Sequence, residues 1–256
     1  MLKYALLMSI FVISACADNT ELSLSINMMK MDYREYDWGK LIDSEKTSAL
    51  PGFGIQYKKQ LNKRGLSNRS YFDIDYSQYY GNTDYVGFNL GSGGGHYGDV
   101  VTITKNTISD GSFGYSEEKL FNNYLVFMRL GIGYRYWERA LSDGHTEEYT
   151  WPYGTVKMGM SGELTSVDTL GIAAEYHYAI SPKMKSNSYG VFDLGRTDGF
   201  SVVVPWEHTL TSSWAIKFTY MYQTWNISQS NTNFGYYEPA SESKFHSINA
   251  ALVYCY

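Results

Sequence analysis

The sequence predicts an all-β fold, an antiparallel transmembrane β-barrel of about ten strands. Apolar and polar residues alternate along several segments, most clearly at 126–137 and 248–256. Aromatic residues make up 17% of the chain, including 25 tyrosines, although the mean hydropathy is only −0.33. Transmembrane barrels combine these properties because aromatic girdles lie at both membrane interfaces, whereas the lumen and loops stay polar.

The first 17 residues have the layout of an export signal. Lys3 precedes an apolar run over 5–13, and 14–17 forms a small-x-small cleavage site before Asp18. We therefore expect a signal peptide at 1–17 and one barrel domain at 18–256. Residues 13–16 are also typical of a lipobox, so lipidation of Cys16 is the alternative to cleavage after Ala17.

The composition of the mature chain excludes some functional classes. Loss of Lys3 reduces the basic residues from 21 to 20 against 26 acidic ones, a formal charge of −6. The basic footprint of a nucleic-acid-binding protein is therefore missing. Cys255 would have no disulfide partner within the mature chain, and no thiolate metal site is expected.

The first four expected strands alternate short turns with longer loops. Strand one starts near Glu21 with apolar residues at 22, 24, 26 and 28, and a charged loop follows at 36–46. Strand two covers about 53–57 and ends in a turn at 62–65. Strand three runs from about 71 toward Phe88, and strand four covers about 100–115 after a glycine-rich outer loop at 91–99.

The fifth strand fixes which face of the sheet is the lumen. Its even positions from Val126 to Tyr136 are apolar or aromatic, whereas Arg129 and Arg135 lie on the other face. An arginine in the middle of a lipid-facing surface costs roughly 2–4 kcal/mol. The arginine face should therefore be the lumen.

The remaining strands continue the same pattern. We expect a polar loop at 141–149, strand six over about 156–160, strand seven over about 170–178, a long loop at 182–199 and strand eight over about 202–206. Strand nine covers about 216–223, and a loop at 231–242 leads to the last strand. Strands four and six have the weakest alternation, so eight strands is the alternative count. The short turns should face the periplasm and the long loops the exterior.

The last segment begins at Ile248, has apolar or aromatic residues at every second position and ends on Tyr256. It resembles the C-terminal signature of bacterial outer-membrane β-barrels, which the barrel-assembly machinery recognises. The resemblance implies an outer-membrane location; a buried last strand of a soluble sheet is the alternative. We expect a monomer in contact with membrane lipid and no cofactor.

Two small groups of ionisable residues face the predicted lumen. Asp73 and Asp75 lie on strand three, and Glu175 and His177 lie on strand seven, nearly opposite in a ring of ten. Such carboxylates and an imidazole could activate a water molecule for hydrolysis. The alternative is a network of ion pairs with Arg129, Arg135, Lys217 and Lys58, because buried charges need partners.

At these residues the chain resembles the omptins, outer-membrane proteases with ten strands, an aspartate pair and an Asp-x-His pair. The resemblance implies catalytic roles for Asp73, Asp75, Glu175 and His177, with Glu175 replacing the second aspartate. The strand geometry, however, places Asp75 and His177 deeper than the outer rim where omptin catalytic groups lie.

Other functions depend on the exterior of the barrel. The expected loops are rich in Tyr, Asn, Ser and Gly, which suits a surface protein with a structural or recognition role. Lys244 and His246 lie near the outer end of the last strand, where they could contact lipopolysaccharide phosphates. A narrow channel and a lipid-modifying barrel are further alternatives, and no cluster has metal-ligand spacing.

Overall fold

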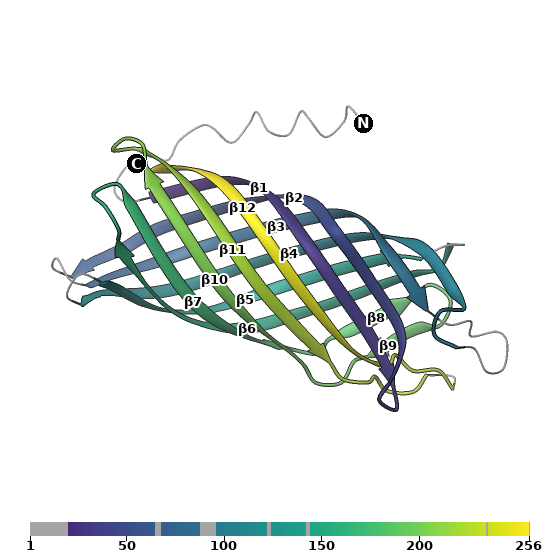
Figure 1. Cartoon of the computed structure of the whole chain (residues 1–256). Coiled ribbons are helices and arrows are strands. Elements are labelled where there is room, and N and C mark those ends of the chain that lie inside the picture. The colour runs from purple at the N-terminus through teal and green to yellow at the C-terminus, as the bar shows by residue number, and fades with distance from the viewer. Residues whose placement is uncertain are drawn as a thin grey trace.

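The computed structural model describes residues 20–64, 68–87, 96–121, 124–141, 144–233 and 235–255. These residues form twelve strands, and ten of them close into one antiparallel barrel (Figure 1). The predicted signal peptide at 1–17, Cys16 and Tyr256 lie outside the described residues. The strands are β1 Thr20–Asp37, β2 Lys40–Arg64, β3 Asn68–Gly87, β4 Val100–Phe121, β5 Tyr124–Ala140, β6 Thr146–Glu163, β7 Asp168–Ala179, β8 Lys183–Ser186, β9 Gly190–Asp193, β10 Thr197–Thr209, β11 Trp214–Ile227 and β12 Ala240–Cys255.

The ring closes because the first and last strands pair. β1 and β12 are antiparallel over their whole length, from Glu21 opposite Cys255 to Tyr36 opposite Ala240. The other neighbours follow chain order, except that β7 pairs with β10. The predicted count of ten is therefore confirmed, including the weakly alternating β4 and β6. The described residues contain no helix that is long and apolar enough to cross a membrane.

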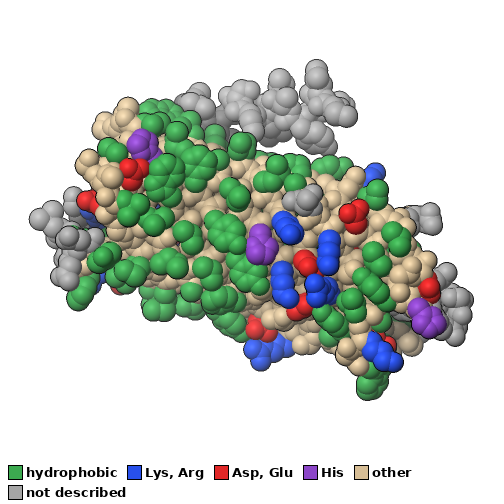
Figure 2. All heavy atoms as spheres, in the orientation of Figure 1, with side chains coloured by type: hydrophobic (Ala, Val, Ile, Leu, Met, Phe, Trp, Pro, Cys, Tyr) green, Lys and Arg blue, Asp and Glu red, His purple; other side chains and the backbone are tan. Residues whose placement is uncertain are grey.

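The predicted inward and outward faces are also confirmed. Arg129 and Arg135 are buried in the lumen, whereas Leu130 and Ile132 between them are 53% and 64% exposed. Hydrophobic side chains cover the left part of the barrel wall in Figure 2, where the same alternation places them on the other strands. Such a wall suits contact with acyl chains, which offer no hydrogen-bond partner to polar side chains.

Several predicted loops are strands that extend beyond this apolar wall. The loop expected at 36–46 is a two-residue turn, Trp38 and Gly39, between β1 and β2. The loops expected at 141–149 and 231–242 are shortened by β6 and β12, and the one at 182–199 contains β8 and β9. The predicted loops were too long because strands outside the membrane need no apolar face. Such strands therefore show no apolar–polar alternation in the sequence. Of the glycine-rich loop at 91–99, residues 91–95 lie outside the described part.

The two extra strands continue the wall at its outer end. β8 pairs with β6 above the point where β7 ends, and β9 pairs with β8. The lumen between these outer walls holds the main hydrophobic cluster, whose largest members are Trp137, Trp151, Trp225, Tyr33, Tyr149, Phe192 and Phe245. The barrel is therefore filled by side chains in its outer half.

Candidate functional site in the charged lumen and on the outer wall

A layer of ion pairs around Arg129 lies in the middle of the lumen. Arg129 Nη2 is 2.6 Å from Asp73 Oδ1 and 3.3 Å from Asp75 Oδ2, and Nη1 is 3.6 Å from Glu175 Oε1. Arg129 Nε also donates a hydrogen bond to Asp73 Oδ1 at 2.7 Å. Since burial of a lone charge is costly, this arginine and its carboxylates stabilise one another. We call these four residues the Arg129 layer.

The Arg129 layer contains three of the four residues predicted for catalysis. Arg129 lies between the aspartates of β3 and Glu175 of β7, which also accepts a 2.5 Å hydrogen bond from Thr155 Oγ1 and lies 3.6 Å from Lys157 Nζ. The carboxylates therefore converge on cations. No hydrogen bond links a carboxylate of β3 to one of β7 in the described part of the chain.

The fourth predicted residue, His177, has different partners. Its Nε2 is 2.9 Å from Ser201 Oγ, and its ring packs against Tyr153 and Trp225 with centroid distances of 5.5 and 5.2 Å. Its Nδ1 is buried and has no hydrogen-bond partner among the described residues. The structure thus places His177 in an aromatic environment and does not pair it by a hydrogen bond with Glu175, Asp73 or Asp75.

A second charged layer lies toward the extracellular end, around Arg139. Arg139 Nη1 is 2.8 Å from both Glu35 Oε1 and Glu147 Oε2, and Nη2 is 2.7 Å from Glu45 Oε1. The side chains of Arg139 and Glu45 are 1% and 0% exposed. We call these four residues the Arg139 layer; it joins β1, β2, β5 and β6.

Neutral side chains extend the Arg139 layer across the lumen. Glu45 Oε2 accepts hydrogen bonds from Thr83 Oγ1 and Asn106 Nδ2 at 2.7 and 2.9 Å, and Trp137 Nε1 donates to Asn106 Oδ1 at 2.7 Å. On the other side, Tyr149 donates to Glu238, which lies in the segment between β11 and β12. The network therefore reaches from β3 and β4 to this last outer segment.

Acidic side chains outnumber cations in and around the Arg139 layer, and this excess shifts the pKa values of the carboxyls. Burial, followed by the charge of Glu35, raises the pKa of Asp43 to about 8, and burial also raises the pKa of Glu238. Burial alone would raise the pKa of Glu147, but the Arg139 charge and a hydrogen bond from His145 outweigh it and lower that pKa. Glu147 in the Arg139 layer is therefore ionised, whereas the neighbouring carboxyls of Asp43 and Glu238 are readily protonated.

The Arg139 layer was missed in the sequence. Glu35 and Glu45 lie at the edge of or within the segment expected to be a charged loop, and Glu147 lies in the next one. The lumenal position of Arg139 could have been predicted, because this residue continues the inward-facing odd positions of Arg129, Arg135 and Trp137 along β5.

The predicted lipopolysaccharide contacts lie on the outer wall of the barrel. His246 Nδ1 is 2.8 Å from Tyr220 OH, and Lys244 Nζ is 3.3 Å from Glu242 Oε1. Across the β1–β12 seam, Lys30 is opposite His246 and Asp32 is opposite Lys244. Arg34 and Lys46 flank Asp32, at 3.1 and 3.9 Å. In Figure 2 basic side chains gather with a few acidic ones beyond the hydrophobic region. We call Lys30, Arg34, Lys46, Lys244 and His246 the outer-wall patch.

Metal binding has no candidate in this part of the molecule. Across residues 20–64, 68–87, 96–121, 124–141, 144–233 and 235–255, no group of three His, Cys, Asp or Glu side chains could hold a metal ion. The charged layers are instead held together by arginine and lysine.

Comparison with known proteins identifies the architecture. No family model and no curated protein matches the sequence. The fold is similar to the crystal structure of the outer membrane protease OmpT from Escherichia coli, with a TM-score of 0.57 and 12% sequence identity over 96% of this chain and 99% of that one. Weaker similarity is found to the translocator domain of the autotransporter NalP from Neisseria meningitidis, with a TM-score of 0.46 and 8% identity over 95% of this chain and 90% of that one.

The transport unit of the autotransporter AIDA-I from Escherichia coli matches with a TM-score of 0.45 and 9% identity over 97% of this chain and 94% of that one. At such identities the similarity concerns the fold alone. The ten strands of the antiparallel ring and the apolar outer wall agree with the similarity to OmpT. The chain therefore has the fold of a bacterial outer-membrane β-barrel, with the ten-stranded architecture seen in OmpT.

Proposed function

We propose that this protein is a closed, non-enzymatic surface barrel that recognises its partners with its extracellular end. The observation that carries the proposal is the filling of the lumen by the Arg129 and Arg139 layers. Both arginines are at least nine-tenths buried, and each pairs with three carboxylates. A peptide substrate or a solute would have to displace these pairs, at a cost of several kcal/mol for each ion left unpaired.

In this proposal Asp73, Asp75 and Glu175 stabilise the barrel wall, and His177 contributes to the aromatic packing above them. The support is geometric, because the Arg129 guanidinium occupies the space that a water molecule would need for activation between the aspartates and Glu175. Hydrolysis of the omptin kind would require this arginine to leave.

The extracellular tips carry side chains that suit recognition. Trp38 lies in the tight turn between β1 and β2 and is 92% exposed. Nearby, Tyr237 OH donates a 2.6 Å hydrogen bond to Asp37, which joins the β11–β12 segment to this turn. Tryptophan and tyrosine are frequent binding hot spots because they offer a large contact area at low entropic cost.

The proposal also assigns the contacts with the envelope. Lys244 and His246, as part of the outer-wall patch, would bind lipopolysaccharide phosphates at the outer interface. The strand that starts at Ile248 would be recognised by the barrel-assembly machinery, and a single closed barrel would act as a monomer. The exposed apolar residues Ile248 and Leu252 on β12, at 60% and 48%, support a lipid-facing role for this strand.

Peptide hydrolysis by the refolded protein tests the enzymatic part of this proposal. Protein supplied with lipopolysaccharide is incubated with a fluorogenic peptide that carries paired basic residues, alongside the variants Asp75→Asn and His177→Ala. We expect wild type and both variants to be equally inactive. Cleavage by wild type that either variant abolishes would establish the hydrolase alternative.

Replacement of the extracellular tips tests the recognition part. The variant Trp38→Ser and a second one with residues 231–237 replaced by glycine and serine are displayed on cells and compared with Arg129→Lys in an adhesion assay. Loss of adhesion in the tip variants alone supports recognition. Equal adhesion of all variants, with the barrel folded, would contradict it.

A further inference from the structure

The barrel wall has a local opening between β2 and β3, beyond the apolar band. Pairing is regular up to Gly52 opposite Tyr79 and resumes at Lys46 opposite Asp84. Between these points, residues 47–51 of β2 face residues 80–83 of β3 without register pairs. β2 is irregular there against β1 as well, where the register shifts between Met29 and Met31. β2 therefore bends away from β3 at this level.

The opening is closed on its lumenal side and open on its outer side. Leu50 is fully buried in the lumen and packs against Gly81, where an added Cβ would be only 2.7 Å from Leu50 Cδ2. Outside, a hollow of about 530 Å³ remains. This volume lies within the range of about 300–1,000 Å³ that is usual for small-molecule sites. Its lining residues are Thr47, Ala49, Pro51, Tyr80, Gly81, Asn82, Asp84 and Lys105.

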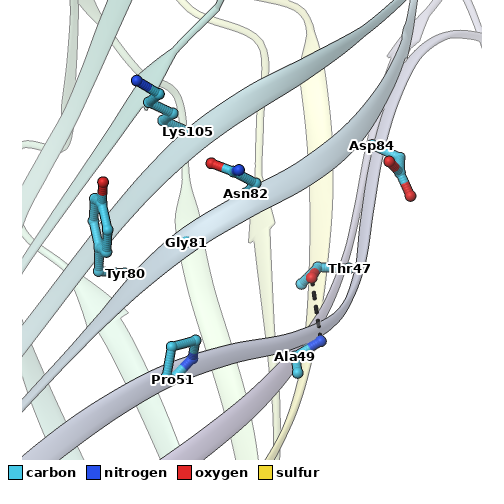
Figure 3. A pocket seen from close by; sticks show the side chains of 8 residues that line it. All are labelled: Thr47, Ala49, Pro51, Tyr80, Gly81, Asn82, Asp84 and Lys105. Carbon is cyan, nitrogen blue, oxygen red and sulfur yellow. Dashed lines mark hydrogen bonds between the residues drawn. The ribbon is translucent and has the colours of Figure 1, made fainter.

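Three polar side chains of this hollow have no hydrogen-bond or ion-pair partner among the described residues, whereas Thr47 Oγ1 accepts a hydrogen bond from Ala49 N at 3.2 Å. Figure 3 shows Tyr80 and Asn82 on β3 and Lys105 on the adjacent strand β4, with β2 across the gap. None of these three side chains forms a hydrogen bond or ion pair with the described residues. Arg34, Lys46 and Lys244 on the neighbouring wall are, in contrast, all paired with Asp32 or Glu242. An amide, an unpaired cation and a 60% exposed aromatic ring thus face one space.

Asp84 contributes one negative charge to the same hollow. Lys46 lies directly opposite it across the β2–β3 pair. The site therefore has a cation on β4, a carboxylate on β3 with a second cation beside it, and an aromatic ring below. Carboxylate and amide groups bind sugar hydroxyls, an aromatic ring packs on the apolar face of a sugar, and a lysine pairs with phosphate.

The height of the hollow indicates where its ligand comes from. On β3 the exposed apolar and aromatic series of the wall runs through Ile74 and Tyr76 to Tyr80, and Asn82 is the next outward-facing position. At about 3.3 Å per residue and a tilt near 40°, Asn82 lies roughly 5 Å beyond Tyr80 along the membrane normal. The hollow therefore lies just beyond the aromatic edge of the acyl-chain region, level with the phosphates and sugars of the outer-leaflet glycolipid.

We infer that this hollow binds a phosphorylated sugar of the outer-leaflet glycolipid. Lys105 pairs with the phosphate, Asn82 and Asp84 bind sugar hydroxyls, and Tyr80 packs against the sugar ring. The inference depends on the outer-membrane location but not on recognition by the extracellular tips. The site adjoins the outer-wall patch at Lys46, but its unpaired cation, Lys105, comes from β4, whereas the patch lies on β1, β2 and β12.

Binding of purified glycolipid to the refolded barrel tests this inference. The probe is lipopolysaccharide with a phosphorylated inner core, and the comparison is the same material after dephosphorylation. Affinity is measured by microscale thermophoresis in detergent micelles. Lys105→Met should weaken binding of the phosphorylated probe about tenfold, as expected from the loss of one charge-assisted hydrogen bond. Binding of the dephosphorylated probe should not change.

Two further variants make the result specific. Lys119→Met removes an exposed lysine near the periplasmic end of the same strand and should leave both affinities unchanged. Tyr80→Ser should weaken binding of both probes, because it removes the sugar contact rather than the phosphate contact. All of these residues are exposed, and unchanged heat-dependent mobility on gels confirms that each variant is folded.

The inference fails if Lys105→Met and Lys119→Met bind the phosphorylated probe equally well, or if wild type binds both probes with the same affinity. A double change of Lys244 and His246 to Ser separates the two wall sites. If only this double variant loses affinity, the outer-wall patch binds the lipid and the hollow does not. If Lys105→Met loses affinity and the double variant does not, the hollow is upheld and the patch proposal fails.

Discussion

Arg129 shows how one side chain determines what the lumen can do. Its planar guanidinium presents five N–H donors, and in this barrel they reach Asp73, Asp75, Glu175 and Ser112. A lysine would supply the same charge as a single point, without the fork that satisfies several carboxylates together. The three acids are therefore tolerated in the middle of the membrane because this arginine is present.

Removal of Arg129 should be strongly destabilising. Arg129→Met leaves Asp73 and Asp75 without an ion-pair partner among the described residues, while Glu175 keeps Lys157, and breaking a buried pair in this way costs about 3–5 kcal/mol. The temperature at which the barrel unfolds, followed by its mobility on gels, should fall markedly. The matched control is Arg196→Met, which breaks the exposed pair with Asp198 and should shift this temperature far less. Equal shifts in the two variants would show that the Arg129 layer is not a buried network.

Asp43 should make the extracellular half sensitive to pH. Its pKa rises from 3.8 to about 8 because of burial and the charge of Glu35, so the folded state binds more protons than the unfolded state between these values. This contribution to stability is complete below about pH 4 and is lost as the pH rises through about 8. The unfolding temperature should therefore fall between about pH 4 and pH 8, and Asp43→Asn should flatten this slope. An unchanged slope in the variant would assign the dependence to other groups.

At the scale of single strands, the alternation of side chains places each residue in lipid or lumen. Ile26 on β1 is 75% exposed on the lipid-facing wall, whereas Asn27 beside it is buried in the lumen. Ile26→Arg should therefore cost roughly 2–4 kcal/mol and reduce insertion into lipid vesicles. Lys30→Ala, four residues further along the same face but beyond the apolar series, should insert like wild type. If both variants inserted equally, the apolar band would have to lie elsewhere.

The turn between β1 and β2 combines strain and exposure. Trp38 and Gly39 have φ angles of 48° and 76°, and this left-handed geometry suits a two-residue hairpin but not tryptophan. Trp38→Asn should therefore keep the turn and stabilise it by up to about 1 kcal/mol, while it weakens partner binding by the extracellular end. Destabilisation would show that the indole contributes to folding.

The same elements show what sequence reasoning could predict. Contact with lipid requires an apolar residue at every second position of a strand. The strands that carry Ile26, Ile132 or Leu252 could therefore be predicted from their apolar face. Outside the membrane a strand can be polar on both faces, and the strand that contains Glu45 therefore resembles a charged loop in the sequence. The opening at residues 47–51 could not be predicted either, because it depends on the contact between Leu50 and Gly81 across two strands.

At the scale of the whole molecule, the two charged layers predict a barrel that does not conduct. Reconstituted wild type should show no current steps in planar bilayers. The double variant Arg129→Ser and Arg139→Ser, if it folds, should show small leak currents, because it removes the centre of both layers. Steps of comparable size in wild type would favour a narrow channel and contradict the closed lumen.

The candidate site was predictable only in part at this scale. Parity placed Asp73, Asp75, Glu175 and His177 in the lumen, where the structure also has them. It did not give their partners, because the contact of Arg129 with both β3 and β7 depends on barrel shear and on rotamers. The Arg139 layer required strands that have no apolar pattern, and its four residues come from four separate strands.

The length of the strands has a consequence for the cell surface. β4 contains 22 residues, which at about 3.3 Å per residue and a tilt near 40° rise roughly 55 Å. An apolar band of about 25 Å accounts for less than half of this rise. More than half of the wall height therefore lies outside the apolar band, so the long strands carry the extracellular tips well away from the membrane surface.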